Sequence, residues 1–341
     1  MTASPHPAVG AASSIAWNDP ARAAAFGRWL DRIAPAHRLI PQTVRLASAD
    51  ASFRRYFRID TNSEARTRIV MDAPPDKENS APFVEIARHM ADAGVKAPQV
   101  LEWDAADGFL LLDDLGSRTM LDVIDPANAD ASRPLYGQAI DALIAWQLAS
   151  KPDVLPPYDS ALLERELALF PQWYIAQHRG VAVEGTIKER LDRAFKAIVA
   201  NNLAAPNVYV HRDFMPRNLM VADDGGPLGV LDFQDAVYGP ITYDIASLMR
   251  DAFLSWDEDF VLDITVRYWQ QARKAGLPVH EDFGEFYRAV EWMGLQRHLK
   301  VAGIFARLTL RDGKPKYLAD TPRFIAYIRA TAGRYTELTP L

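Results

Sequence analysis

Cysteine is absent from all 341 residues of the sequence. Disulfides, thiol nucleophiles and cysteine-ligated zinc are therefore excluded, which suits a protein of the reducing cytoplasm. Hydrophobic runs are short as well, and none approaches the roughly 18 apolar residues that span a bilayer. The first residues lack the basic start and the long apolar segment of a secretory signal. We predict a cytoplasmic protein with a disordered leader over residues 1–16, rich in Ala, Ser and Pro.

The sequence also lacks an excess of positive charge. It has 38 Lys and Arg against 44 Asp and Glu, a formal net charge of −6, and the basic residues are dispersed. Nucleic acid is therefore not an expected partner, and nothing indicates a membrane or an obligate protein partner. With 49% hydrophobic and 24% charged residues, the composition is that of a globular protein with a sizeable core.

Strand-like segments fill the first third of the chain. A helical pattern over residues 21–33, which we expect to end before Pro35, comes first. Turn-forming residues then separate three strand-like segments. A helical segment with Phe83, Ile86 and Met90 on one face follows, and two more strands come after it. The five predicted strands cover residues 44–48, 55–60, 68–73, 99–103 and 109–115.

From about Gly116 the pattern changes, because almost every segment has helical periodicity. The exception is a strand-rich island over residues 208–233. We therefore predict an α+β protein of two lobes. The N-terminal sheet lobe covers residues 17–115 and the helical lobe covers residues 116–341.

The island carries polar, reactive side chains between two apolar runs. The segment VYVHRDFMPRNLMV contains His211, Arg212, Asp213 and Asn218 at the spacing of the kinase catalytic loop, H-R-D-x-x-x-x-N. Fourteen residues after Asn218, GVLDFQDA supplies a further carboxylate, Asp232, at the end of an apolar strand. In kinases this is the place of a metal-binding Asp.

Phosphoryl transfer requires these residue types for definite reasons. A carboxylate, here Asp213, orients the acceptor hydroxyl and takes its proton. Magnesium prefers hard oxygen ligands, which Asn218 and Asp232 provide. The alternative is purely structural: Asp213 caps a turn, Asn218 satisfies backbone groups and Asp232 ends a strand.

At these residues the chain resembles the aminoglycoside phosphotransferase and choline kinase superfamily. The segments VYVHRDFMPRNLMV and VLDFQDAVYGPITYDIAS carry the likeness. It implies the two-lobe fold of protein kinases, with ATP and Mg²⁺ as cofactors. It also implies a structural role for Asp244, which would open a helix and brace the catalytic loop. For His211 we expect a bracing role by hydrogen bonding rather than titration in the reaction.

A closer likeness comes from LASADASFRRYFRI, VMDAPP, LLLDDLG and LQRHLKVAGIFARLTLRDGKPKYLADTPR. These segments resemble the bacterial anomeric kinases of N-acetylmuramate and N-acetylglucosamine. The resemblance implies phosphorylation of the C1 hydroxyl of an amino sugar from ATP, in the recycling of cell-wall sugars.

The sequence departs from the kinase pattern where the nucleotide would bind. SADASFRRYF replaces the Gly-rich loop, and strand three offers Met71 and Asp72 where kinases carry a lysine. One interpretation gives the phosphate contacts to an arginine of the loop; the other is a pseudokinase that binds without turnover. Glu85 lies in the helix that holds the partner of that lysine. The candidate nucleotide-binding residues are the hydroxyls of Ser48 and Ser52, the guanidinium groups of Arg54 and Arg55, and the main chain near Asp113 and Leu115.

The acceptor site is less well defined by the sequence. N-acetylmuramate carries a lactyl carboxylate, which Arg or Lys would meet, whereas a cationic aminoglycoside calls for carboxylates. Aromatic rings could stack on a sugar face, although core packing is the default for each of them. The candidates are Arg217, Arg297, His298, Lys300, Trp173, Tyr174 and Trp292.

Three function classes stay open at this point. The first is a sugar 1-kinase, and a variant of it is a kinase of choline, homoserine or an aminoglycoside. The second is a nucleotide-binding regulator without turnover. The third, a protein kinase, is disfavoured because only about ten residues separate Asp232 from YDIAS, which leaves little room for an activation segment.

Overall fold

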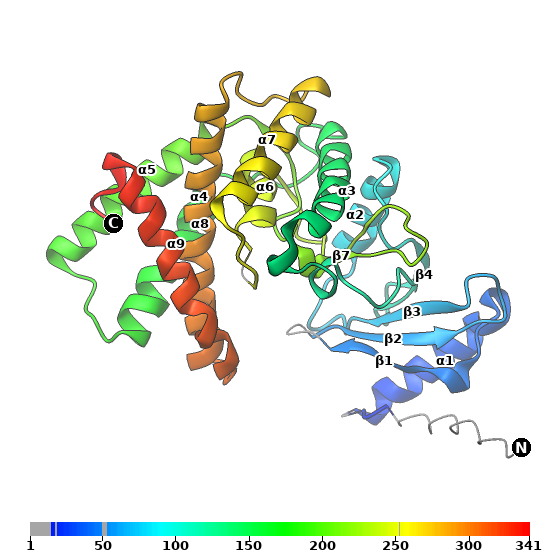
Figure 1. Ribbon diagram of the computed structural model, residues 1–341. Coiled ribbons are helices and arrows are strands. Elements are labelled where there is room, and N and C mark those ends of the chain that lie inside the picture. The colour runs from blue at the N-terminus through cyan, green and yellow to red at the C-terminus, as the bar shows by residue number, and fades with distance from the viewer. Residues whose placement is uncertain (1–14, 18, 50–52, 252) are drawn as a thin grey trace, which may run out of the picture. The chain divides into compact units, whose positions relative to one another are not determined.

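The computed structural model describes residues 15–17, 19–49, 53–251 and 253–341 (Figure 1). Most of the predicted leader, and Ser52, lie outside the described residues. The chain forms two compact units: the first contains the residues up to Ala91 together with Ala97–Gly116, and the second contains Asp92–Lys96 and Ser117–Leu341. None of the described helices is long and apolar enough to cross a membrane.

The first unit is built on an antiparallel sheet with the order β1-β2-β3-β5-β4. All five predicted strands are present, with ends within two residues of the predicted ones. Their bounds are β1 (Arg45–Ala49), β2 (Arg55–Asp60), β3 (Thr67–Asp72), β4 (Val100–Asp104) and β5 (Phe109–Asp113). Tyr56 lies opposite Met71, and Arg55 lies opposite Asp72, in the register of β2 and β3.

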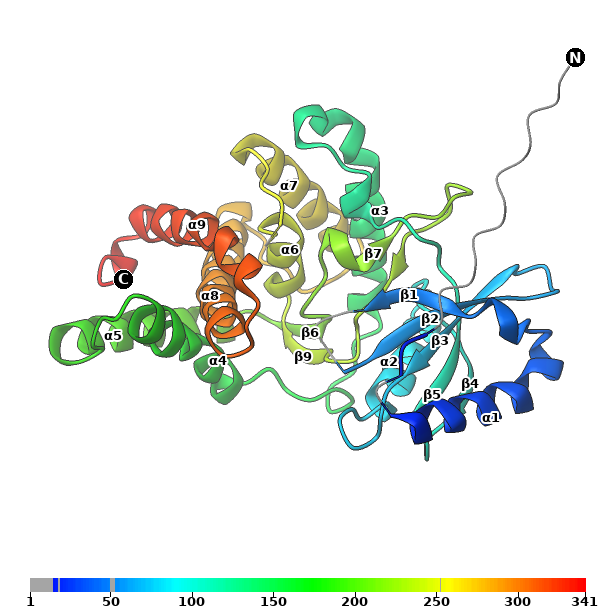
Figure 2. The ribbon, with the colours of Figure 1, turned by 90° about the horizontal axis from the view of Figure 1, so that it is seen from below.

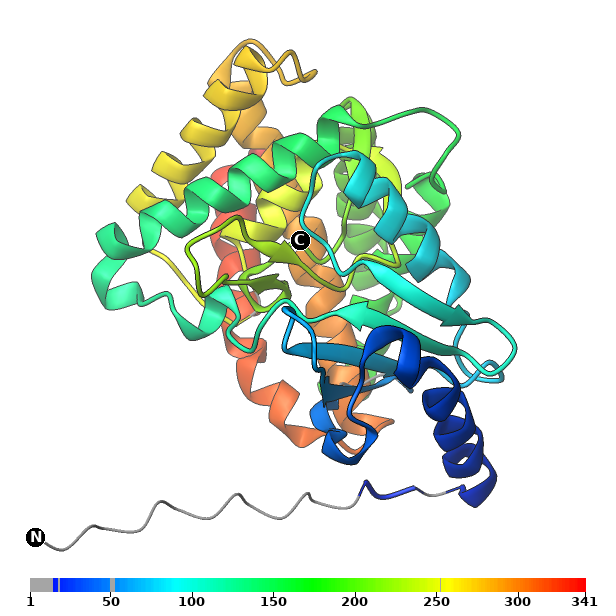
Figure 3. The same ribbon diagram turned by 90° about the vertical axis from the view of Figure 1, so that its right-hand side faces the viewer.

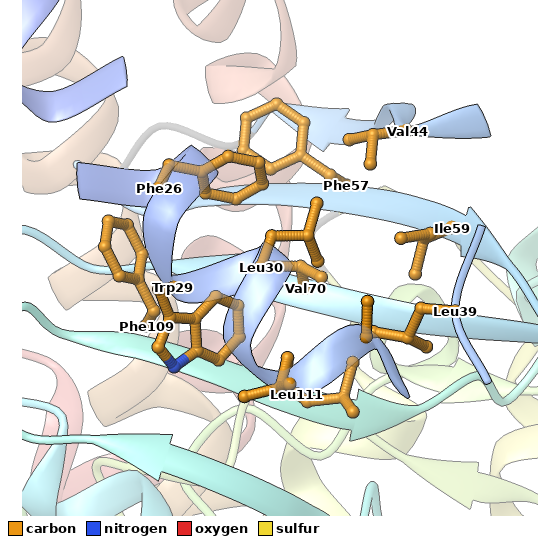
Figure 4. Close-up of a cluster of buried hydrophobic side chains, with 12 residues drawn as sticks. Phe26, Trp29, Leu30, Leu39, Val44, Phe57, Ile59, Val70, Phe109 and Leu111 are labelled. Atoms are coloured by element: carbon orange, nitrogen blue, oxygen red, sulfur yellow. The ribbon is translucent and has the colours of Figure 1, made fainter. Parts of the chain in front are cut away.

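Helix α1 (Pro20–His37) covers one face of this sheet. Phe26, Trp29, Leu30 and Ile33 recur at helical spacing, so they project from one side of the helix. Figure 4 shows Phe26, Trp29 and Leu30 packed against alternate strand residues, and Ile33 belongs to the same buried cluster. The strand residues in this cluster are Phe57, Ile59, Val70, Phe109 and Leu111.

The predicted end of this helix was wrong, because it continues through Pro35 to His37. A proline in the last turn removes only one helical hydrogen bond, and Ile33 and Ala34 remain buried in the core. Arg38, with φ 53°, ends the helix.

Helix α2 (Ala81–Asp92) lies on the opposite side of the sheet from α1, as Figures 2 and 3 show. Its apolar face is buried, with Phe83 4% and Met90 1% exposed. The sheet is therefore a layer between two helices. Side chains that alternate along each strand belong to one helix or the other.

The second unit is mainly helical. Its longest helix, α8 (Phe283–Leu310), packs against α9, α6 and the π-helix η4. Its other helices of eight residues or more are α3 (Ala129–Leu148), α4 (Ser160–Leu167), η4 (Phe170–His178), α5 (Gly185–Leu203), α6 (Thr242–Met249), α7 (Glu258–Lys274) and α9 (Thr321–Arg334). Two short ribbons complete it, formed by β6 (Asn207–Val210) with β9 (Val237–Pro240), and by β7 (Leu219–Met220) with β8 (Gly229–Val230).

Gly303 allows η4 to approach α8 closely. A Cβ atom at this position would lie 2.4 Å from the backbone carbon of Leu169 and 2.5 Å from its oxygen. Backbone cannot yield as a flexible side chain would, so only glycine fits here. The close approach fixes α8, whose middle turns reach the catalytic loop.

Candidate active site

The two ribbons of the second unit position the predicted catalytic residues. The chain leaves β6 at His211, and Asn218 directly precedes β7. Asp232 follows β8, and Leu231 donates its backbone N–H to the carbonyl of Asn218 at 2.9 Å. Pairing of β7 with β8 therefore brings together two residues that are 14 positions apart.

The side chain of Asn218 joins the three residues that the motif singled out. Its Nδ2 donates to the backbone oxygen of Asp213 at 2.9 Å and to Oδ2 of Asp232 at 3.4 Å. Oδ1 of Asp232 accepts from the side chain of Gln234 at 2.9 Å. Asp213, Asn218 and Asp232 thus meet in one place, as their sequence spacing predicts.

The side-chain oxygen atoms of Asn218 and Asp232 suit a magnesium ion. The bonds to Asp213 and Asp232 use the amide hydrogens of Asn218, so its Oδ1 oxygen can face a cation beside the Asp232 carboxylate. Within the described ranges, no three His, Asp or Glu side chains are close enough to hold a metal by themselves. Magnesium commonly takes one or two protein oxygens and completes its shell with phosphate and water. The pair therefore fits a cation that is shared with a nucleotide.

Two residues of the site have backbone conformations that L-amino acids rarely adopt. Arg212 has φ 76° and Asp232 has φ 64°. The left-handed region costs a non-glycine residue about 1–2 kcal/mol, and such residues cluster at functional sites. Surrounding contacts hold Arg212 in place, because its guanidinium donates to Glu166 at 2.8 Å and its carbonyl accepts from Arg297 at 2.6 Å.

Asp244 braces the catalytic loop from the first turn of α6. Its carboxylate accepts the backbone N–H of His211 at 2.7 Å and that of Arg212 at 3.0 Å. The residue is fully buried. Burial raises the pKa of Asp244 to about 7, although the two N–H donors and Arg297 oppose the shift. This is the contact that the predicted structural role requires.

His211 is held in one tautomer. Its Nδ1 accepts the backbone N–H of Asp213 at 3.2 Å, so the ring hydrogen lies on Nε2, which donates to the carbonyl of Leu231 at 3.0 Å. Burial lowers the pKa of His211 to about 4, so the ring is neutral at pH 7. His211 therefore links the catalytic loop to the segment that carries Asp232.

Asp213 remains ionised at neutral pH. Burial acts to raise its pKa, but the positive charges of Lys300, Arg297 and Arg212 outweigh burial, and the pKa lies below the ordinary value. Its side chain is partly exposed. The structure therefore presents a carboxylate that can accept a hydrogen bond from a hydroxyl group.

Glu166 is a residue of the site that sequence reasoning missed. It is 5% exposed, and its carboxylate accepts from Tyr158 at 2.5 Å and from Arg212 at 2.8 Å, and forms an ion pair with Lys300 at 2.9 Å. Lys300 also donates to the hydroxyl of Tyr243 at 3.2 Å. One signal was available: in ALLERELALF, Glu166 stands at helical spacing from the apolar Leu163 and Phe170, on the buried face.

The predicted acceptor-site residues lie in different surroundings. The charged ends of Arg297 and Lys300 are bonded to the protein, as described above. Arg217 stacks over the ring of Phe253, with 4.8 Å from Cζ to the ring centroid, and in the part of the chain that the structure describes it forms no ion pair. Trp173 is partly exposed on η4.

The remaining aromatic candidates pack against the protein. Trp292 is 2% exposed and lies beneath the guanidinium of Arg288. Tyr174 stacks on Phe170 with 5.2 Å between ring centroids. Their rings are therefore largely engaged in packing.

His298 is buried against α9. Its ring stacks on Tyr327 with 4.7 Å between centroids, and it is 3% exposed. Burial lowers its pKa to about 3. The sequence neighbour of Arg297 is therefore part of the core between α8 and α9.

We expect His298→Phe to remove part of the acid sensitivity of folding. The folded pKa of His298 lies below the unfolded value of about 6.5, so the unfolded chain binds the extra proton and stability falls as the pH drops from 6.5. At pH 4.5 this extra proton binding lowers the free energy of unfolding by about 3 kcal/mol. Phenylalanine keeps the stack on Tyr327 without titrating. Urea unfolding at pH 7 and pH 4.5 measures the difference.

The exposed His280 provides the control, since His280→Phe should lose as much stability on acidification as the wild type does. An identical acid loss in His298→Phe and the wild type would contradict the prediction.

The predicted nucleotide-binding residues lie in the first unit. Ser48 is in β1 opposite Tyr56. Arg54 donates to Glu78 at 3.0 Å. Arg55 donates through Nη2 to Asp72 at 2.6 Å.

The end of β5 holds the other two candidates. Asp113 forms an ion pair with Arg68 at 3.4 Å, and its backbone N–H donates to the carbonyl of Gln99 at 3.1 Å. Leu115 follows β5 and is partly buried. Glu85, by contrast, is 64% exposed at its side chain and lies 3.9 Å from His89.

Known proteins resemble this chain over most of its length. A profile of the phosphotransferase enzyme family (APH) matches residues 43–283. The N-acetylmuramate/N-acetylglucosamine kinase of Pseudomonas aeruginosa is 48% identical over 95% of this chain and 96% of that protein. The protein of the same name from Neisseria meningitidis serogroup B is 48% identical, with 92% of each chain covered.

Two solved structures share the fold at low identity. Plasmodium vivax ethanolamine kinase superposes with a TM-score of 0.64 at 9% identity, over 95% of this chain and 93% of that one. An amicoumacin kinase in complex with AMP-PNP and Ca²⁺ superposes with a TM-score of 0.63 at 15% identity, over 89% and 93%. Likenesses at such identity establish the fold, and the predicted kinase-like α+β fold is confirmed.

Proposed function

Because the chain belongs to the phosphotransferase enzyme family, we propose that it transfers the γ-phosphoryl group of ATP to the anomeric C1 hydroxyl of N-acetylmuramate and N-acetylglucosamine. Two relatives of that name at 48% identity support this acceptor class. The observation that carries the proposal is the meeting of Asp213, Asn218 and Asp232 through the Asn218 amide. The absence of cysteine suits the cytoplasm, where we expect the protein to work.

In this proposal Asp213 accepts a hydrogen bond from the C1 hydroxyl, orients its oxygen towards the phosphorus atom and takes its proton. The cations around Asp213 keep it ionised and ready to accept. Asn218 and Asp232 would hold Mg²⁺, which when bound neutralises phosphate charge. His211 and Asp244 keep the loop in the required conformation through their backbone bonds.

On the nucleotide side, main-chain groups near Asp113 and Leu115 would bind adenine. The amicoumacin kinase that shares this fold is described with AMP-PNP, which supports ATP as the phosphoryl donor. Trp173, partly exposed on η4, would contact the sugar face.

A panel of acceptors tests the function. Purified protein with ATP and Mg²⁺ is incubated with each amino sugar, and separately with choline, homoserine and an aminoglycoside. We expect turnover of the amino sugars and loss of their reducing ends, because a phosphate on C1 blocks the free aldehyde whereas a phosphate on C6 does not. A phosphorylated product that keeps its reducing end would refute anomeric transfer. Turnover of another acceptor alone would refute the sugar assignment.

The structure favours Arg217 as the residue that binds the lactyl carboxylate of N-acetylmuramate. It directly precedes Asn218, and its guanidinium stacks on Phe253 with no carboxylate paired to it among the described residues. Arg297 and Lys300 have protein partners instead, in Arg212 and Glu166. A cation without a bonded anion is the better candidate for binding a carboxylate ligand.

Arg217→Met should therefore change substrate preference. A hydrogen bond to a charged group is worth about 1.5–3 kcal/mol, so we expect kcat/KM for N-acetylmuramate to fall about 10- to 100-fold. N-acetylglucosamine lacks the lactyl group, and its kcat/KM should change less than about threefold. Steady-state kinetics with both sugars measures the ratio, and an equal loss for both would rule out a carboxylate contact.

A further inference from the structure

Arg54 directly precedes β2 and Arg55 is its first residue, and the two side chains lie on opposite faces of the sheet. Side chains alternate along a strand, and Phe57 and Ile59 pack against α1 (Figure 4). Arg55 has the parity of Phe57 and belongs to the α1 face. Arg54 and Tyr56 have the other parity and belong to the face on which α2 lies. Tyr56 is opposite Met71, the strand-three residue of that face.

The guanidinium of Arg55 is bonded to the carboxylate of Asp72. The carboxylate of Asp72 is fully buried, and it accepts from Arg55 at 2.6 Å and 3.0 Å through one oxygen and from Arg22 of α1 at 2.6 Å and 2.9 Å through the other. A buried carboxylate needs such partners, and removal of one is strongly destabilising. Arg55 also stacks on Trp17 at 4.0 Å and donates to the carbonyl of Ala16 at 3.2 Å. These contacts attach the helix α1 to the β2–β3 pair.

Arg54 has a different environment. It borders the SADASF segment that replaces the Gly-rich loop, and its Nη2 donates to Oε2 of Glu78 at 3.0 Å. Both side chains are largely buried, at 11% and 17% exposure. Glu78 lies between β3 and α2, shortly before α2 begins.

This pair has the same charges as an ion pair that kinases build from other residues. In kinases a strand-three lysine binds the phosphates and pairs with a glutamate of the following helix. Here strand three has Met71 on that face, and Glu85 of α2 is exposed. Arg54 and Glu78 supply the same two charges on the α2 face, one from the residue before β2 and the other from the segment that leads into α2.

We infer that Arg54 binds the nucleotide phosphates in place of the missing lysine, that Glu78 positions it, and that Arg55 and Arg22 only hold Asp72. A guanidinium has five N–H donors in a planar fork, so it can bond Glu78 and a phosphate together. The inference rests on the ATP-dependence of the proposed function. It does not depend on which acceptor is used.

Binding of ATP, ADP and adenosine without any sugar tests this inference. Isothermal titration calorimetry on Arg54→Met should show ATP affinity reduced about 10- to 100-fold and adenosine affinity unchanged within about twofold, because only the phosphates lose a charged partner. Arg54→Lys keeps the charge and should recover part of the ATP affinity. Glu78→Gln should weaken ATP by about 3- to 10-fold, again without effect on adenosine.

Arg55→Met is the matched control. It should lower the thermal midpoint and, where the protein remains folded, weaken ATP and adenosine by the same factor. Equal losses of ATP and adenosine in Arg54→Met and Arg54→Lys would overturn the inference, and so would a phosphate-dependent loss confined to Arg55→Met. Wild-type ATP binding with no sugar turnover would instead count against the proposed acceptor alone.

Discussion

Asp213→Asn is expected to lower kcat for sugar phosphorylation by about 10³-fold, within the 10²- to 10⁴-fold range that general acid–base catalysis contributes. The amide has the shape of the carboxylate but cannot take the proton of the C1 hydroxyl. Because Asp213 has no proposed contact with the nucleotide, KM for ATP should change less than about threefold. Steady-state rates at saturating ATP and Mg²⁺ measure the loss.

The low pKa of Asp213 adds a pH test. A carboxylate with a pKa below its ordinary value remains ionised at pH 5, so its protonation should not reduce wild-type kcat between pH 8 and pH 5. The control is Asp223→Asn, since this carboxylate is 84% exposed and pairs with Arg118 on the surface. The rate of this variant should match the wild type within about twofold. If Asp213→Asn kept a tenth of wild-type kcat, Asp213 would not be the base.

The second large effect is expected from Asp232→Asn. Loss of one negative ligand weakens magnesium binding, and the cation is worth several kcal/mol in the transition state, so kcat/KM should fall about 10²- to 10⁴-fold. The amide still accepts from Gln234, as the carboxylate does at 2.9 Å. Asparagine also tolerates the left-handed conformation at φ 64°. The loss would therefore report metal binding rather than misfolding.

The dependence of the rate on magnesium distinguishes a loss of metal binding in Asp232→Asn from a general loss of activity. We expect the half-saturating Mg²⁺ concentration to rise at least about tenfold in Asp232→Asn, and chelation with EDTA to abolish wild-type turnover. Asp235→Asn, an exposed carboxylate three residues further on, should leave the metal titration unchanged. A normal magnesium titration in Asp232→Asn would show that Asp232 does not bind the cation.

Local patterns in the sequence were sufficient to predict the sheet and the meeting of the motif residues. Alternation along the strands located β1 to β5, and the fixed spacing from His211 to Asn218 predicted one loop. The turn-forming segment VADDGGPL, residues 221–228, joins β7 to β8, and the pairing of these two strands brings Asp232 to Asn218. Each of these predictions depends on residues that are close in the sequence.

The contacts that could not be predicted join distant segments. Glu166 and Lys300 are 134 positions apart in numbering, and nothing local shows that one carboxylate holds both Arg212 and Lys300. In the same way the sequence could not distinguish Arg54 from Arg55, because their roles depend on α1 and on the segment before α2. Helix α1 also extends beyond its predicted end, because core packing outweighs the one backbone hydrogen bond that is lost at Pro35.

The attachment of α1 to Asp72 also determines how the protein would respond to proteolysis. A cut between Arg22 and the rest of α1 would release one of the two guanidinium groups that are bonded to a fully buried carboxylate. Oδ1 of Asp72 would lose both hydrogen bonds that Arg22 donates to it, and a buried acceptor that loses its donors is destabilising. Strand β2, which directly follows Arg54, is bonded to the strand that carries this carboxylate. Clipping the amino-terminal end would therefore disturb the strand next to Arg54, for which we propose the phosphate contact.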